Sequence, residues 1–228
     1  MVKPPTGGNE GGRQKPARLK TATGRTPSSQ AWLERQINDP FSAKARAMGY
    51  RSRAAFKMTE IDDRFHLFRH GAKVIDLGCA PGGWIQVALQ RNAGAVVGVD
   101  LLAIEPPLQG DAIILQMDFT DPDCPPKLLE LLGGPPDVVL SDMAPNTVGH
   151  KQTDHLRIMN LIEIAADFAV EVLKPGGAFV TKAFQGGETA GVIALLKRHF
   201  ADVRMMKPKA SRSESSEVYF VATGFRGR

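Results

Sequence analysis

The stretch from Val74 to Trp84, VIDLGCAPGGW, constrains the fold of this chain more than any other. An apolar run leads directly into a turn of small residues, and apolar side chains then recur at helical spacing. This pattern predicts a buried strand, a tight turn and the start of a helix. Gly78 and Gly82 let the backbone approach a ligand closely, because a glycine has no Cβ.

Acidic residues near the ends of the predicted strands indicate a nucleoside-binding site. Asp76 is expected to end the first strand, and Asp100 ends the next apolar run, where a carboxylate can accept hydrogen bonds from a ribose. The glycine spacing differs from G-x-G-x-x-G, which argues against a dinucleotide. The chain has no G-K-[ST] sequence, so a phosphate-binding P-loop is not expected either. A strand-turn-helix connection without a ligand is the alternative for this stretch alone.

Strands and helices alternate along the rest of the chain. A helical pattern runs from Phe41 to Phe68 with a break at Gly49-Tyr50, and its second part would place Phe56, Ile61 and Phe65 on one inner face. Further strands are predicted at 112–117, 136–142, 178–184, 203–206 and 217–222, and helices at 153–173 and 188–200. This alternation predicts an α/β fold in which helices cover both faces of a parallel sheet.

Composition excludes several classes of protein. The chain has 228 residues, of which 43% are hydrophobic and 23% charged, and no apolar run approaches the length of a membrane span. Its start also lacks the apolar core of a secretory signal, so we expect a cytoplasmic protein without a membrane partner. Cys79 and Cys124 give neither a disulfide framework nor metal-ligand spacing, so we expect no metal site.

The net charge of +5 is unevenly distributed. Residues 1–27 hold six basic residues and one acid, with almost no large apolar side chains, and we expect a disordered basic arm. Residues 28–228 are then expected to form one domain. Two blocks within it, 41–57 and 197–212, are again rich in Lys and Arg. Such clusters are typical of nucleic-acid binding, although solvent-exposed basic faces can cluster without it.

The order of the glycine turn and the acids resembles the Rossmann-like methyltransferases that bind S-adenosylmethionine. The resemblance implies that Asp100 binds the ribose hydroxyls, Asp118 the adenine amino group, and that Asp142 lies next to the sulfonium. Trp84 would lie along the cofactor or, alternatively, in the core. The implied cofactor-binding residues are Asp76, Gly78, Gly82, Trp84, Asp100, Asp118 and Asp142.

Five short motifs make this resemblance more specific. They are SRAAFK ending at Lys57, DLGCAPGGW ending at Trp84, SDMAPN beginning at Ser141, KAFQG beginning at Lys182 and SSEVY around Glu217. Together they resemble the FtsJ-like ribose 2′-O-methyltransferases, from Ser28 to Gly224. The resemblance implies a mostly parallel seven-stranded sheet with an antiparallel last strand. It also implies methylation of a uridine 2′-hydroxyl in large-subunit ribosomal RNA, within the assembled or late-assembling 50S subunit.

That family has a Lys-Asp-Lys-Glu tetrad, which corresponds here to Lys57, Asp142, Lys182 and Glu217. Methyl transfer from a sulfonium is an in-line displacement, so positioning the hydroxyl should supply most of the catalysis. Lys182 could act as the base, but neutrality near physiological pH requires a pKa shift of roughly 3 units, about 4 kcal/mol. Alternatively Lys182 stays charged and stabilises a developing alkoxide.

Three other functions are compatible with parts of this pattern. The same chemistry could act on transfer RNA or on the cap of messenger RNA. A base N-methyltransferase usually has a Pro-Pro-aromatic loop after the fourth strand, whereas this chain has Ala144-Pro145-Asn146. A non-catalytic assembly factor could keep the fold, but it would be expected to lose members of the tetrad. We expect a monomer, since the sequence has no spare apolar surface pattern.

Overall fold

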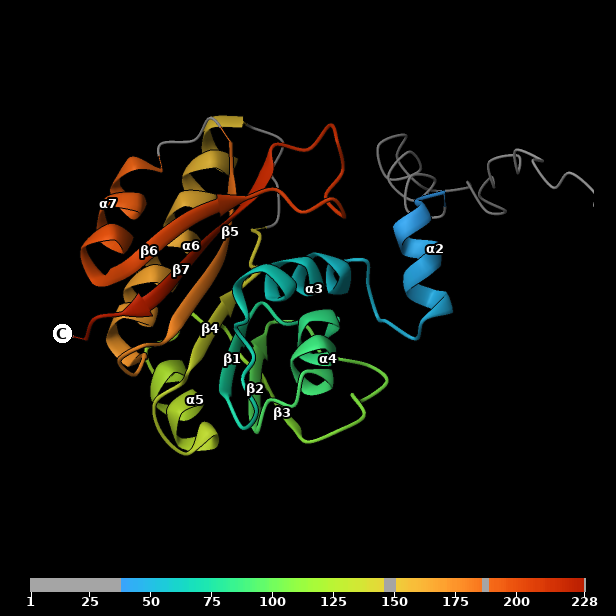
Figure 1. The fold of residues 1–228 in the computed structure, drawn as a ribbon, viewed down its shortest axis with the longest axis horizontal. Coiled ribbons are helices and arrows are strands. Elements are labelled where there is room, and N and C mark those ends of the chain that lie inside the picture. The colour runs from blue at the N-terminus through green and yellow to red at the C-terminus, as the bar shows by residue number, and fades with distance from the viewer. Residues whose placement is uncertain (1–37, 146–150, 186–188, 228) are drawn as a thin grey trace, which may run out of the picture.

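A computed structural model describes residues 38–145, 151–185 and 189–227. The expected basic arm, the start of the domain at Ser28, and the motif residues Asn146 and Gly186 lie outside the described residues. The described chain folds around one twisted sheet with helices on both sides (Figure 1).

The sheet has seven strands in the order β3-β2-β1-β4-β5-β7-β6. Pairing is parallel from β3 to β5, and β7 is antiparallel to both of its neighbours, β5 and β6. The strands are β1 (Lys73–Leu77), β2 (Ala95–Asp100), β3 (Ala112–Gln116), β4 (Val138–Ser141), β5 (Ala178–Phe184), β6 (Phe200–Met206) and β7 (Glu217–Phe225). This confirms the predicted fold, including its antiparallel last strand.

Two groups of helices cover the two faces of the sheet. Alternate strand residues point to opposite faces, so Val74 of β1 belongs to the core cluster that includes α3 and α4, while Ile75 belongs to the cluster that includes α5, α6 and α7. The helices are α2 (Pro40–Ala47), α3 (Ala54–Phe65), α4 (Gly83–Gln90), α5 (Cys124–Leu132), α6 (Lys151–Val172) and α7 (Ala190–His199). None of these helices is long and apolar enough to cross a membrane.

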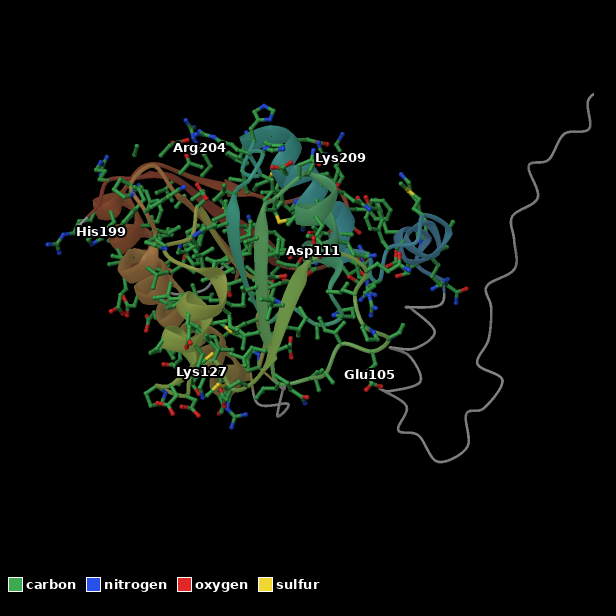
Figure 2. The ribbon with its side chains drawn as sticks, turned by 90° about the horizontal axis from the view of Figure 1, so that it is seen from below. Glu105, Asp111, Lys127, His199, Arg204 and Lys209 are labelled. Carbon is green, nitrogen blue, oxygen red and sulfur yellow. The ribbon has the colours of Figure 1, made fainter. Side chains whose placement is uncertain are left out.

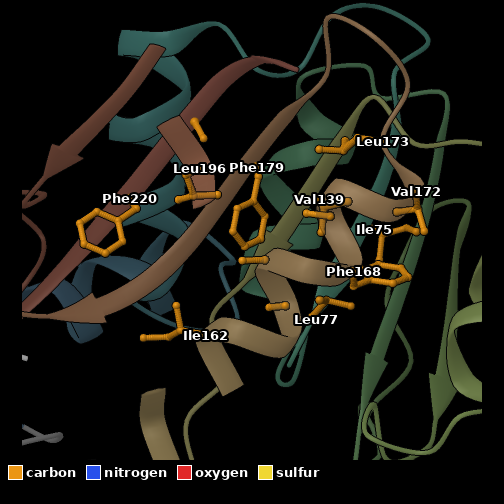
Figure 3. Close-up of a cluster of buried hydrophobic side chains, with 14 of the residues drawn as sticks. Ile75, Leu77, Val139, Ile162, Phe168, Val172, Leu173, Phe179, Leu196 and Phe220 are labelled. Carbon is orange, nitrogen blue, oxygen red and sulfur yellow. The ribbon is translucent and has the colours of Figure 1, made fainter. Parts of the chain in front are cut away.

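The core on the α6 side consists of large apolar side chains from the central strands and from α6 and α7. Figure 3 shows Phe179 of β5 between Val139 of β4 and Leu196 of α7, and both Phe179 and Val139 are fully buried. β4 and β5 are buried along almost their whole length, and their residues are mostly apolar apart from Ser141, Thr181 and Lys182. These two strands therefore form the buried centre of the sheet.

Two details differ from the sequence-based prediction. Helix α5 was not predicted. It begins with Cys124-Pro125-Pro126, since proline is tolerated in the first turn of a helix, and Gly133 ends it in a left-handed conformation. Phe56 does not share the inner face of α3 with Ile61. It packs instead against Phe41 and Tyr50, beside α2.

The turn after β1 requires glycine for a steric reason within the protein. Gly78 has a φ of +75°, and a Cβ on it would lie 3.0 Å from both the backbone nitrogen and the Cα of Met143. The chain that follows β4 therefore packs directly on this turn. This contact fixes Met143 and the adjacent Asp142 against the end of β1.

We predict that Gly78→Ala destabilises the protein more than Gly176→Ala, which serves as the control. Both glycines have a left-handed φ, which costs an L-residue roughly 1–2 kcal/mol, but a Cβ on Gly176 would meet no atom within 4 Å. The collision with Met143 should add about 1–3 kcal/mol. Urea unfolding of the cofactor-free variants measures both losses. Equal losses would contradict the steric role of Gly78.

Candidate active site

The four residues of the expected tetrad meet at the carboxyl edge of the sheet, on the face that α3 covers. Asp142 directly follows β4, and Lys182 lies in β5 two residues before its end. Because β7 is antiparallel, its first residue, Glu217, lies at this same edge, opposite Phe184. Lys57 reaches the edge from the first turn of α3. Residues far apart in the sequence thus form one cluster, which we call the tetrad.

Two ion pairs connect the tetrad. Lys57 Nζ lies 2.6 Å from Glu217 Oε1, and Lys182 Nζ lies 3.1 Å from Asp142 Oδ1. Lys182 also donates a hydrogen bond of 2.7 Å to the backbone carbonyl of Asp142. Lys182 is only 9% exposed. Hydrogen bonds to charged groups are stronger than neutral ones, so both lysines have defined positions at this edge.

Tyr219 joins the two ion pairs. Its hydroxyl lies 3.1 Å from Asp142 Oδ1 and 3.2 Å from Glu217 Oε1, and it accepts a hydrogen bond from Lys57 at 3.2 Å. A phenol has one proton, so it donates to one of these carboxylates at a time. Tyr219 was not among the residues predicted for this site. Its position two residues after Glu217, on the same face of a strand, was the signal that could have identified it.

The pKa values of Glu217 and of the neighbouring Tyr219 are shifted in opposite directions. Burial alone would raise the pKa of Glu217, but the charge and hydrogen bond of Lys57, with help from Lys182 and Ser211, hold that pKa below its usual range. Burial raises the pKa of Tyr219 well above its usual value, and Asp142 and Glu217 add to this. Glu217 is therefore ionised and Tyr219 neutral near physiological pH.

A pocket of about 440 Å³ adjoins the tetrad. It lies between the turn after β1 and the start of α3, and its lining includes Asp76, Gly78, Arg51, Ser52 and Asp142. Asp142 thus belongs both to this pocket and to the tetrad. A ligand in the pocket would reach the tetrad through Asp142.

Asp76 and Ser52 line this pocket with polar atoms that lack partners. Asp76 is the penultimate residue of β1 and is 1% exposed, and neither of its carboxylate oxygens has a hydrogen-bond partner; the same is true of Ser52 Oγ. Burial raises the pKa of Asp76 well above its usual value, with further increases from Asp142 and Asp100. A buried carboxyl group surrounded by negative charge is stabilised by a cationic ligand. S-adenosylmethionine carries two cationic groups, so the acidic groups around Asp76 fit this cofactor.

Asp100 and Asp118 lie near the carboxyl ends of β2 and β3, as we expected from the sequence. Asp100 accepts hydrogen bonds of 2.9 Å from the backbone of Ala80 and of Leu102, so it holds the glycine turn against β2. Asp118 is exposed, and hydrogen bonds from the backbone and then the hydroxyl of Thr120 hold its pKa below the usual range. Both carboxylates keep lone pairs that can accept further hydrogen bonds.

Gly82 and Trp84 have structural partners of their own. Gly82 has a φ of +101°, and a Cβ there would lie 2.8 Å from Leu108 Cδ2. Trp84 is buried, its indole N–H donates to the carbonyl of Ala54 at 3.0 Å, and its ring packs on Tyr219. Trp84 also borders the pocket, so core packing and contact with a ligand are compatible at this position.

The described residues contain no group of three or more His, Cys, Asp or Glu side chains that could hold a metal ion. The arrangement at the edge therefore consists of two features: a pocket with an unpaired buried carboxyl group, and a neighbouring set of two lysines, two carboxylates and a neutral phenol.

Comparisons with known proteins identify the family of this chain. The model of the FtsJ-like methyltransferase family matches residues 50–225. Proteins named ribosomal RNA large subunit methyltransferase E, from Caulobacter sp. strain K31 and Caulobacter vibrioides, are 75% and 72% identical, each over 100% of both chains. A crystal structure from Plasmodium falciparum, described as a ribosomal RNA methyltransferase, is 30% identical with a TM-score of 0.69. That match covers 78% of this chain and 100% of the other. This chain therefore belongs to the FtsJ-like methyltransferase family.

Proposed function

We propose that this protein uses S-adenosylmethionine to methylate the 2′-hydroxyl of a uridine in large-subunit ribosomal RNA. The main observation in support is the tetrad, whose two ion pairs lie beside a pocket suited to a cation. The relatives named ribosomal RNA large subunit methyltransferase E support the choice of RNA. Because the proposed substrate belongs to the ribosome, we propose that the protein acts in the cytoplasm on the assembled or late-assembling 50S subunit.

In this proposal the pocket binds the cofactor. S-adenosylmethionine, when bound, supplies an electrophilic methyl group. Asp76 and Asp142 would face its cationic groups, Asp100 would accept from the ribose hydroxyls and Asp118 from the adenine amino group. Gly78, Gly82 and Trp84 would form the walls. The unpaired carboxyl group of Asp76 supports this assignment. It is buried with no opposite charge beside it, and a bound cation would supply that charge.

The tetrad would orient the acceptor hydroxyl. The ammonium of Lys182 donates to the carbonyl and the carboxylate of Asp142, and it has a third N–H with which to contact the hydroxyl oxygen. We therefore propose that Lys182 steers this oxygen and stabilises the negative charge that develops on it as the hydroxyl proton passes to solvent and the oxygen takes the methyl group. Lys57 and Glu217 would hold Tyr219 and Asp142, and through them Lys182, in place.

The basic side chains near the pocket would bind RNA phosphates. Arg46 and Arg51 line the pocket, and Lys207 and Lys209 lie in the loop before β7, which contacts α3. Contacts with phosphates position a nucleic acid without selecting its sequence. The choice of a 2′-hydroxyl is consistent with an RNA substrate, because only RNA has this group.

We predict that Asp76→Asn weakens cofactor binding while it stabilises the cofactor-free protein. The amide removes a buried charge, so it should lower the affinity for S-adenosylmethionine roughly 10- to 100-fold and raise the free energy of unfolding. The unfolded carboxyl ionises at its usual pKa, whereas the buried one keeps its proton up to its raised pKa, so wild-type stability falls between these two values and the gain from Asp76→Asn should grow with pH over that window. Calorimetric titration and urea unfolding between pH 5 and pH 8 measure these effects.

Titration with S-adenosylhomocysteine provides the control, since it keeps the ammonium but lacks the sulfonium charge. An equal loss of affinity for both ligands would assign Asp76 to the ammonium. A larger loss for S-adenosylmethionine would assign it to the sulfonium. Unchanged affinity for both would contradict a role for Asp76 in the cofactor site.

We predict that Lys182→Ala lowers the rate of methyl transfer by a hundredfold or more, the order expected for a lost stabiliser of developing charge. Cofactor affinity should stay within about threefold of wild type, because the other pocket residues remain. Lys174→Ala is the matched control: this lysine pairs with Asp137 at the opposite end of β5 and should be fully active. Single-turnover assays with labelled cofactor measure the rate. A Lys182→Ala variant as active as Lys174→Ala would remove Lys182 from this role.

We predict that large ribosomal subunits from a strain without this enzyme accept one methyl group on a uridine ribose. Nuclease digestion and mass spectrometry should identify 2′-O-methyluridine, and the Lys182→Ala protein should leave the subunits unmodified. Label in transfer RNA alone would favour the other RNA branch, and label on a base would favour a base methyltransferase. Binding to subunits without methylation of any RNA would favour an assembly factor.

A further inference from the structure

The loop between β6 and β7, residues 207–216, is attached to α3 by a carboxylate. Glu60 of α3 accepts hydrogen bonds from the backbone N–H of Lys209 at 2.7 Å and of Ala210 at 2.9 Å. Figure 2 shows Lys209 beside α3. Two backbone donors on one carboxylate fix both the position and the direction of this part of the loop.

A second residue attaches the same loop to α2. The guanidinium of Arg53 donates to the carbonyl of Ala210 and also pairs with Asp39, the N-cap residue of α2. Ala210 is fully buried beside Phe56. Within the loop, Lys207 Nζ donates to the carbonyls of Ser213 at 3.2 Å and Ser215 at 2.7 Å. The loop therefore has a defined conformation, held from α3, from α2 and from within.

This conformation places Ser211 against the tetrad. Ser211 is buried, and its hydroxyl donates a hydrogen bond of 3.0 Å to Glu217 Oε1. The same oxygen accepts from Lys57 at 2.6 Å and lies 3.2 Å from the hydroxyl of Tyr219. Glu217 and Lys57 both have long side chains with several rotatable bonds, so a third, short and buried donor restricts where their ion pair can lie.

We propose that Ser211 is a positioning residue for the ribose methylation proposed above, and that Glu60 acts through it. Ser211 touches neither the pocket nor Lys182 in the described structure, and its contribution is to orient the carboxylate that pairs with Lys57. Glu60 fixes the backbone next to Ser211, so its effect on the tetrad passes through the serine hydroxyl. This inference rests on the proposed function, because it assigns these residues to that reaction.

The first test compares Ser211→Ala with Ser213→Ala, an exposed serine of the same loop whose hydroxyl donates to the adjacent Glu214. We expect Ser211→Ala to lower kcat roughly tenfold, the order expected for a lost hydrogen bond to a charged group, with KM for RNA unchanged. Ser213→Ala should match wild type. Ser211→Thr keeps the hydroxyl and should recover most of the activity.

The pH profile separates positioning from loop packing. Removing a donor to the Glu217 carboxylate weakens its ionised form, so the pKa of Glu217 should rise in Ser211→Ala. The ion pair with Lys57 is lost as the pH falls through this pKa, and the acidic limb of the rate profile should therefore move to higher pH. A packing defect alone would lower the rate by the same factor at every pH of the profile.

A double variant tests the proposed role of Glu60. Glu60→Ala should lower kcat in the same direction as Ser211→Ala, and the combined variant should be no slower than Ser211→Ala alone, since both changes remove one effect. Multiplied losses in the double variant would show that Glu60 acts independently of Ser211 and would overturn that part of the proposal.

Carbon NMR titration of the Glu217 side chain distinguishes a failure of this inference from a failure of the proposed function. It measures the pKa of Glu217 in wild type, Ser211→Ala and Ser213→Ala without any methyl transfer. An unchanged pKa in Ser211→Ala, or a kcat equal to that of Ser213→Ala, would overturn the positioning role. A raised pKa in a protein whose wild type methylates no ribose would instead reject the proposed function.

Discussion

The antiparallel pairing of β7 with β5 determines where the site can form. Its register sets Tyr219 opposite Lys182 and Glu217 opposite Phe184. Because β7 runs against the other strands, its first residues lie at the edge where β4 and β5 end, beside Asp142. Side chains two apart on a strand point to the same face, so Glu217 and Tyr219 both face α3. A parallel strand at this place would bring its last residues to the edge, and neither group would reach Lys57.

The two halves of this edge differ in charge balance. In the tetrad, two ammonium groups face two carboxylates, and a neutral phenol lies between them, so each buried charge has a partner. Such compensation is needed, since an unpaired buried ion costs several kcal/mol. The pocket next to it lacks this balance, because Asp76 has no partner and its charged neighbours, Asp142 and Asp100, are acids. The protein alone thus pairs every charge of the tetrad, whereas Asp76 keeps no partner although Arg46, Arg51 and Arg53 also line the pocket.

Local patterns in the sequence allowed the strands of the sheet to be predicted to within a few residues, and the resemblance of its short motifs to a family indicated the four tetrad residues. Tyr219 and Ser211 were missed for a physical reason. Their roles arise from contacts with Asp142 and Glu217 that depend on strand register and on the fold of a loop, which hydrophobic periodicity does not determine. The predicted orientation of Phe56 was wrong for a similar reason. α2 supplies an apolar surface for this side chain, and the helical pattern of α3 alone cannot indicate that surface.

One turn of α3 holds the start of β7 at two points. Lys57 and Glu60 are three residues apart, so their side chains lie on neighbouring positions of the helix surface. Lys57 donates a hydrogen bond directly to the Glu217 carboxylate. Glu60 accepts a hydrogen bond from the backbone of the loop, and Ser211 of this loop donates to the same oxygen of Glu217. A shift of α3 along its axis would therefore disturb both contacts together. The apolar residues that seat α3 on the sheet, such as Met58 and Ile61, thereby also set the geometry of Glu217.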